Sequence, residues 1–114
     1  HHIDDKECEF EYAKNGMIGL ESLFGGVSSL VSGEWPLEKL IDTLSVAPRK
    51  IFGLPIPEIK EGTVASLTLF NPLKEYIFER SMIQSKSANA AFIGKKLKGK
   101  VIGIINKNQL VLNT

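Results

Sequence analysis

Two prolines within residues 54–58 set the strongest limit on how this chain folds, because they divide it into unlike halves. Proline lacks a backbone N–H and restricts the residue before it, so Pro55 and Pro57 prevent a helix from continuing through this segment. Apolar residues before it recur at helical spacing, whereas those after it form short runs typical of strands. We therefore expect an α+β chain, with helices in residues 1–53 and a connector followed by strands in residues 54–114.

The first half carries the pattern of an amphipathic helix over residues 20–31. Gly25 and Gly26 lie inside this pattern, and each costs about 1 kcal/mol relative to alanine in a helix interior. We therefore expect a kink or a close packing contact at these glycines. The apolar residues fall at i, i+3, i+4 and i+7, on one helix face: Leu20, Leu23, Phe24, Val27, Leu30 and Val31.

Two more helices are expected before the connector. Pro36 suits the first position of a helix that runs to about Ser45, because a first-turn N–H has no partner within the helix. Pro48 opens a short third helix in the same way. Gly53 is placed to end that helix in a left-handed conformation.

Apolar runs predict the strands of the second half. Residues 64–70 form one candidate, stopped by the Asn-Pro dipeptide at 71–72, and residues 75–80 form another. Alternation within the latter places Tyr76 and Phe78 on one face.

A closing hairpin is expected at the end of the chain. Residues 100–105 and 109–113 flank Asn106-Lys107-Asn108, where asparagine tolerates a positive φ. The second half is therefore expected to form antiparallel β structure.

Composition is that of an ordinary globular protein and excludes several classes. A chain of 114 residues with 43% hydrophobic and 24% charged residues is expected to fold, but a (β/α)8 barrel takes about 250 residues. A net charge of +1 gives no general attraction to nucleic acid or to a membrane. No apolar run approaches the roughly 18 residues of a membrane span.

Cysteine usage and the first residues add two expectations. Cys8 is the single cysteine, and no signal peptide precedes it, which together favour a reducing, cytoplasmic location. His1 and His2 stand before a charged stretch and are interpreted as the remnant of a purification tag.

Candidate metal and nucleophile sites find little support. Catalytic zinc usually takes three protein ligands, and a serine nucleophile needs a base, yet no internal histidine is present. We therefore assign no catalytic and no metal-binding residue. Acidic residues alternate as in a calcium loop but lack its glycine and final glutamate, so we interpret them as a solvated face: Asp5, Glu7, Glu9 and Glu11.

Lysines provide two further candidates. A pair of Lys86 with Ser85 or Ser87 requires a lysine buried enough to lose its proton, which these polar neighbours disfavour. A basic cluster beside Phe92 has the charge to contact phosphate or RNA, but a solvated loop whose lysines guard a strand edge is the better interpretation. The cluster comprises Lys95, Lys96, Lys98 and Lys100.

The Asn15-Gly16 turn is the best candidate for a binding site. Gly16 and Gly19 permit backbone conformations that a Cβ hinders, and the helix that follows offers N–H groups beside them. Such a loop suits a carboxylate or an amide. The alternative is a loop that needs glycine only to change direction into the helix.

Four segments, in order, resemble the C-terminal end of bacterial dihydroorotases of the amidohydrolase superfamily. The departures are Asn15, where a bulky residue is common, and Ala90-Ala91, where Thr-Pro is usual. The segments are residues 15–22 (Asn-Gly-Met-Ile-Gly-Leu-Glu-Ser), 40–54, 61–72 and 85–101 (Ser-Lys-Ser-Ala-Asn to Gly-Lys-Val).

This resemblance implies a fold and a substrate role. Residues 1–53 would be the end of the (β/α)8 barrel, with its substrate loop and helices, and residues 54–114 the C-terminal strands of a small composite β-sandwich. The main chain of Asn15 and Gly16 would contact dihydroorotate. The parent enzyme would use zinc to interconvert N-carbamoyl-L-aspartate and (S)-dihydroorotate in de novo pyrimidine biosynthesis.

The same resemblance places the metal ligands and the catalytic aspartate upstream, so this chain alone is expected to lack activity and a cofactor. Its apolar faces would then lack partners, which predicts self-association. Two other functions remain open. One is a non-catalytic, dihydroorotase-like scaffold that holds a partner such as aspartate transcarbamoylase, and the other is a small nucleic-acid binder that uses the lysine cluster.

Overall fold

The computed structural model describes residue 4, residues 7–107 and residues 109–113. His1 and His2, interpreted above as a tag remnant, lie outside the described residues, as do Asp5 and Asn108. The elements follow one another as α1 (Leu23–Leu30), α2 (Leu37–Ile41), the π-helical turn η2 (Asp42–Val46), α3 (Ala47–Ile51), β1 (Ser66–Ile77), the 3₁₀ turn η3 (Arg80–Met82), β2 (Lys96–Asn106) and β3 (Gln109–Leu112).

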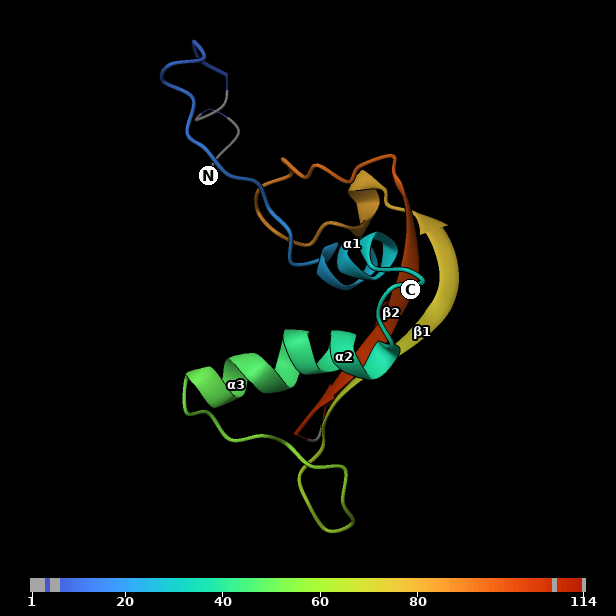
Figure 1. Ribbon diagram of the computed structural model, residues 1–114. Helices are drawn as coiled ribbons and strands as arrows, with labels where there is room; N and C mark the ends of the chain where they lie inside the picture. Colours follow the sequence, from blue (N-terminus) through green and yellow to red (C-terminus); the bar gives the residue numbers. More distant parts are fainter. Residues whose placement is uncertain (1–3, 5–6, 108, 114) are drawn as a thin grey trace.

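Helices precede strands, and this order confirms the α+β prediction. The three strands form one antiparallel sheet in the order β1-β2-β3. In Figure 1, α1 lies beside β2, and the continuous ribbon of α2 and α3 lies below it. Within the described residues, no helix has the length and apolar character needed to cross a membrane.

Pro48 lies in the first turn of α3, as predicted, but η2 joins α2 and α3 into one continuous helical segment with no gap before Pro48 (Figure 1). In a regular α-helix, the Pro48 ring would clash with the Leu44 carbonyl and leave it without a donor. The wider π-helical turn η2 lies directly before α3, where Pro48 occupies the first turn, and so carries the chain past this obstacle.

Gly53 ends the helical segment as predicted. Its φ is +64°, in the left-handed region that favours glycine. The Leu54 N–H donates to the Arg49 carbonyl at 2.8 Å, and the Gly53 N–H donates to the Lys50 carbonyl at 3.3 Å. These two bonds form a Schellman motif and release the chain into the extended connector.

Helix α1 starts at Leu23, three residues later than its apolar pattern predicts, and packs closely at its two glycines. Gly25 and Gly26 are buried. A Cβ on Gly25 would meet the hydroxyl of Tyr76 on β1, and one on Gly26 would lie 3.2 Å from the Phe92 ring. The close packing expected at this glycine pair is therefore confirmed.

Strand β1 runs through the Asn-Pro dipeptide, so the prediction of two separate strands is wrong. The register shifts between Asn71 and Glu75, which places Pro72 in a bulge, where its missing N–H breaks no ladder hydrogen bond. The Asn71 side-chain oxygen accepts hydrogen bonds from the N–H groups of Leu73 and Lys74, at 3.0 and 3.1 Å. The Asn71 side chain thus provides a hydrogen-bond acceptor for two N–H groups in the bulge, and the strand continues beyond it.

The closing hairpin is confirmed, although β2 starts at Lys96 rather than Lys100. The positive φ falls on Lys107, at +55°, and not on Asn106. The Lys107 N–H donates to the Ala65 carbonyl at 2.9 Å, so this turn is also tied to the residue just before β1.

A small core lies between α1 and the sheet. Phe78 is only 1% exposed and Leu97 only 2% exposed, and the rings of Phe24 and Phe70 pack with their centroids 4.7 Å apart. The predicted shared face of Tyr76 and Phe78 is the buried one, since β1 is half-buried at Tyr76.

Replacing Gly25 with alanine tests the contact between α1 and the sheet. Alanine gains about 1 kcal/mol in helix propensity, but its Cβ meets the Tyr76 hydroxyl, and overpacking costs about 1–3 kcal/mol. We expect Gly25→Ala to lower the free energy of unfolding in urea, and Tyr76→Phe in the same chain to recover part of the loss. Gly19→Ala is the control, since nothing lies within 4 Å of the point that its new methyl group would occupy; equal stability of both alanine variants would contradict the prediction.

Candidate functional site

Two segments far apart in the sequence, residues 15–22 and residues 84–89, lie side by side and run antiparallel. The Asn89 side-chain amide donates to the Gly16 carbonyl at 3.0 Å. Five residues after Gly16, the Glu21 carboxylate accepts hydrogen bonds from residues 84 and 85. The candidate loop is therefore held at two points by the second segment.

The Asn15-Gly16 turn adopts a conformation that requires glycine. Gly16 has a φ of +108°, and both Asn15 and Gly16 are exposed to solvent. The Ile18 N–H donates to the Asn89 carbonyl at 3.2 Å, so Asn89 contacts the loop on both sides of Met17. The turn is thus exposed to solvent, while the residues that follow it are held by Asn89.

Glu21 closes the other end of this loop. A single oxygen, Oε1, accepts three hydrogen bonds: from the Gln84 N–H at 3.1 Å, the Ser85 N–H at 2.8 Å and the Ser85 hydroxyl at 2.6 Å. Hydrogen bonding from the Ser85 hydroxyl is the main cause that lowers the pKa of Glu21 below its ordinary value of 4.5, and partial burial opposes it. The carboxylate is therefore held in its charged form.

A partly buried serine on α1 anchors the site to the sheet. The Ser29 hydroxyl donates to the Gly25 carbonyl at 2.6 Å and accepts a hydrogen bond from the Lys98 N–H on β2 at 2.7 Å.

Beside the loop, α1 leaves a shallow hollow of about 190 Å³. Its lining is mainly apolar and includes Met17, Ile18, Leu23, Val27, Leu30 and Phe92.

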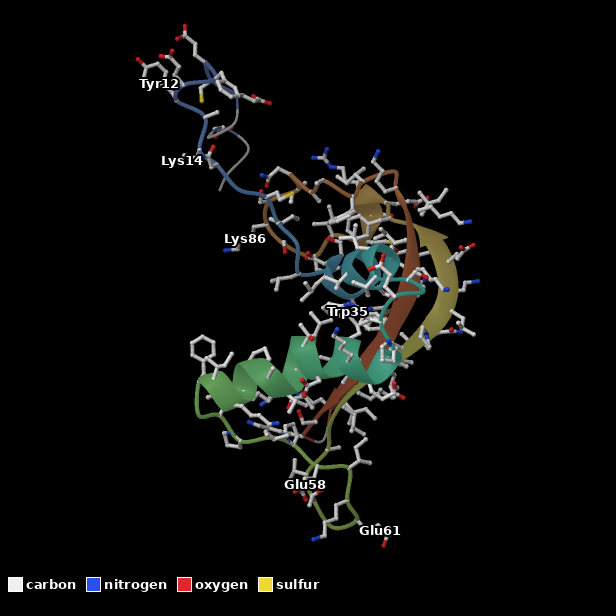
Figure 2. All side chains as sticks on the ribbon, viewed as in Figure 1. Tyr12, Lys14, Trp35, Glu58, Glu61 and Lys86 are labelled. Atoms are coloured by element: carbon white, nitrogen blue, oxygen red, sulfur yellow. The ribbon has the colours of Figure 1, made fainter. Side chains whose placement is uncertain are left out.

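The Ser-Lys candidate is not assembled. The Ser85 hydroxyl donates to Glu21, and the Ser87 hydroxyl donates to the Asn89 side-chain oxygen at 2.6 Å. Lys86 lies between them and is exposed, and Figure 2 shows its side chain pointing away from the helices. Neither serine is therefore activated by this lysine.

The acidic residues at the start of the chain are exposed where the structure describes them, at Glu7, Glu9 and Glu11, in agreement with a solvated face. Among residues 4, 7–107 and 109–113, no three His, Cys, Asp or Glu side chains lie together as metal ligands. The described residues therefore do not fit a zinc ion.

Three of the four clustered lysines, Lys96, Lys98 and Lys100, lie on β2, and Lys95 directly precedes it, so the loop interpretation is wrong. From Lys96 to Lys100, β2 pairs with β1 alone, because β3 begins to pair only at Gly103. The Lys96 ammonium contacts the Glu75 carboxylate at 2.7 Å, and that hydrogen bond is the first cause of the lowered pKa of Glu75. This exposed pair neutralises part of the cluster.

Sequence reasoning selects Asn15 and Gly16 but misses the residues that hold them. Glu21, Ser85 and Asn89 all lie within the segments that carry the family resemblance, yet the sequence alone gives Glu21 and Asn89 no role and suggests Ser85 only as a partner of Lys86. Their hydrogen bonds join residues 63 to 73 positions apart, so no local pattern could identify the partners.

Comparison with known proteins identifies relatives along nearly the whole chain. The chain is 38% identical over 112 residues to the dihydroorotase of Citrifermentans bemidjiense, and these cover 97% of the chain and 26% of that protein. It is 39% identical over 114 residues to that of Chlorobaculum tepidum, with 98% and 26% covered, and 37% identical over 113 residues to that of Clostridium acetobutylicum, with 97% and 27% covered. No family model matches the chain.

These similarities confirm the resemblance to dihydroorotases found in the sequence. The chain spans about a quarter of the length of these curated relatives, which is consistent with a C-terminal fragment of a dihydroorotase.

Two substitutions at Glu21 separate its charge from its shape. Glu21→Ala removes all three acceptor contacts, and we expect it to lower the free energy of unfolding near pH 7 by about 1–3 kcal/mol, after allowance for partial exposure. Glu21→Gln keeps an acceptor oxygen at the same position and is expected to lose less.

The pH dependence follows from the lowered pKa of Glu21. Its stabilising contribution is complete above the unfolded-state pKa of about 4.5 and is lost as the pH falls through the lower folded-state pKa. We therefore expect the stability difference between the wild-type chain and Glu21→Gln to shrink in denaturation curves recorded from pH 7 to pH 3. A difference that stays constant over this range would show that the charge contributes nothing.

Proposed function

We propose that this chain, a relative of dihydroorotases over nearly its whole length, is the C-terminal part of a dihydroorotase. The parent enzyme would interconvert N-carbamoyl-L-aspartate and (S)-dihydroorotate by opening or closing a cyclic amide, in de novo pyrimidine biosynthesis. The observation that carries this proposal is the similarity to proteins of that name along 97% of the chain.

The proposal assigns the two halves of the chain to different parts of the parent. Residues 1–53 belong to the end of the hydrolase barrel, and residues 54–114 belong to a composite β-sandwich. The small sheet supports this assignment, because its three strands offer few buried side chains and gain from further strands supplied elsewhere in the parent.

Asn15 and Gly16 are proposed to contact the substrate through their main chain. The positive φ of Gly16 and the exposure of both residues support this role, since main-chain groups at a glycine turn can approach a carboxylate or an amide closely. A main-chain contact also tolerates asparagine at position 15, where a bulkier residue is usual.

The remainder of the parent is proposed to supply the metal-binding residues. Zinc is proposed to bind residues outside the chain, so the chain by itself is expected to be inactive and to take no cofactor. We also propose that the parent is cytoplasmic and that it associates with aspartate transcarbamoylase. A parent without metal ligands would instead be a non-catalytic scaffold.

Self-association of the isolated chain is proposed from its shape and exposed apolar surface. Its radius of gyration is 16.4 Å, whereas about 13 Å is typical of a compact domain of this length. Large apolar side chains stand exposed along much of it, among them Phe10, Ile51, Phe52, Ile59 and Val64. Such surface is normally covered by a partner.

Gel filtration coupled to light scattering tests this prediction. We expect a dimer or larger species at micromolar concentration, because association buries the exposed apolar side chains. A monomer over the whole concentration range would contradict the prediction.

Glycine substitutions in the full-length parent test the substrate loop. We expect Gly16→Ala to lower kcat/KM for dihydroorotate by roughly tenfold, because an alanine at a φ of +108° carries about 1–2 kcal/mol of strain and shifts the turn. Gly19→Ala, in the same loop but without a positive φ or a close neighbour, is expected to stay within about twofold of wild type.

The controls distinguish the parts of this proposal. Absence of dihydroorotase activity in the purified, zinc-loaded parent would overturn the enzyme assignment. Normal activity in both glycine variants would retain the enzyme but remove the substrate role of Gly16.

A further inference from the structure

We propose that Asn89 is a positioning residue for the substrate loop: its side-chain amide fixes the Gly16 carbonyl and so sets the orientation of the Asn15-Gly16 main chain. This inference rests on the proposed function, because it deepens the role given there to the loop. It assigns a task to a residue that contacts neither substrate nor metal in the proposal.

The contacts of Asn89 bracket the loop. Its Nδ2 donates to the Gly16 carbonyl at 3.0 Å, and its own carbonyl accepts a hydrogen bond from the Ile18 N–H at 3.2 Å. The first bond fixes the peptide plane that follows Gly16, and the second fixes the plane before Ile18. Met17 between them is therefore held from both sides, although its side chain is 63% exposed.

The Gly16 carbonyl determines which end of the Asn89 amide faces it, because a carbonyl can only accept a hydrogen bond. The NH2 group therefore points to Gly16, and the Asn89 Oδ1 accepts a hydrogen bond from the Ser87 hydroxyl at 2.6 Å. A rotated amide would place two oxygens against each other at Gly16. The contact with Ser87 holds the same amide from within its own segment.

The turn needs an external contact such as that of Asn89 because it contains glycine. Gly16, with its φ of +108°, has access to more backbone conformations than any other residue type, so the turn does not hold its own shape. The loop also touches the body of the molecule at Glu21, but that contact lies five residues away from Gly16. The Asn89 amide, by contrast, donates to the carbonyl of Gly16 itself.

The position of the segment is itself fixed by Glu21. Three hydrogen bonds from Gln84 and Ser85 to its carboxylate attach residues 84–85 to the start of α1. Asn89 therefore acts from a segment that is anchored to the same helix that the loop enters. The loop and its support are thus both attached at the start of α1.

Kinetics of the full-length parent test the proposal. Asn89→Asp keeps the size of the side chain and can still accept from Ser87, but it presents an oxygen to the Gly16 carbonyl. We expect KM for dihydroorotate to rise about tenfold with kcat changed less than threefold, because the loop binds substrate and performs no chemistry. Asn89→Ala is expected to raise KM to a similar extent.

Asn113→Asp is the matched control. The Asn113 amide donates to the Val101 carbonyl at 3.4 Å, so the same change removes the same kind of bond on the hairpin, away from the loop. We expect it to leave KM and kcat unchanged. A merely structural role of Asn89 would lower thermal stability in the same way as at Asn113 and would not raise KM selectively.

Hydrogen exchange adds a readout that does not require activity. We expect the amides of residues 15–18 to exchange at least fivefold faster in Asn89→Asp than in wild type, and at the wild-type rate in Asn113→Asp.

The outcomes separate this inference from the proposed function. An unchanged KM in both Asn89 variants, together with a raised KM in Gly16→Ala, overturns the role of Asn89 and keeps the substrate loop. A parent without dihydroorotase activity overturns the proposed function, and this inference with it.

Discussion

The close approach of α1 to the sheet is the constraint on which the rest of the structure depends. It exists because Gly25 and Gly26 present no side chains to Tyr76 and Phe92, and because Gly99, with a φ of +94°, leaves space for the Phe24 ring. Ser29 then bonds directly to the main chain of β2. With the helix at this distance, residues 15–22 come within hydrogen-bond reach of residues 84–89, and the candidate loop acquires its shape.

Polar contacts, rather than apolar burial, define the loop. Described side chains that are almost fully buried and apolar are few, namely Leu40, Phe78 and Leu97. Instead, the Glu21 carboxylate and the Asn89 amide, from opposite segments of the chain, exchange bonds with main-chain groups. Directional bonds of this kind fix a geometry more narrowly than apolar packing, which suits a loop that is proposed to orient a small polar substrate.

The sequence predicted those features that depend on neighbouring residues. Gly53 ends the helical segment through its own φ, and the alternation at Tyr76 and Phe78 follows from strand geometry. Pro72 misled the prediction because a bulge that Asn71 caps accommodates its missing N–H and lets the strand continue. Pro48 opens α3 as predicted, but the wider helical turn before it, which joins α3 to α2, was not predicted. At the site, Gly16 was recognisable from the sequence, whereas its partner Asn89 was not, since their contact exists only once α1 has docked.

The π-helical turn has a consequence for the two ends of the segment that contains it. A turn that holds one additional residue advances every later side chain by about 100° around the helix axis, which is the rotation of a single residue. Leu40, before the turn, is buried, whereas Ile51 and Phe52, after it, are 78% and 76% exposed. The single helical segment therefore presents two apolar stripes in different directions. The stripe at Leu40 is buried within this chain, whereas the stripe at Ile51 and Phe52 is left exposed.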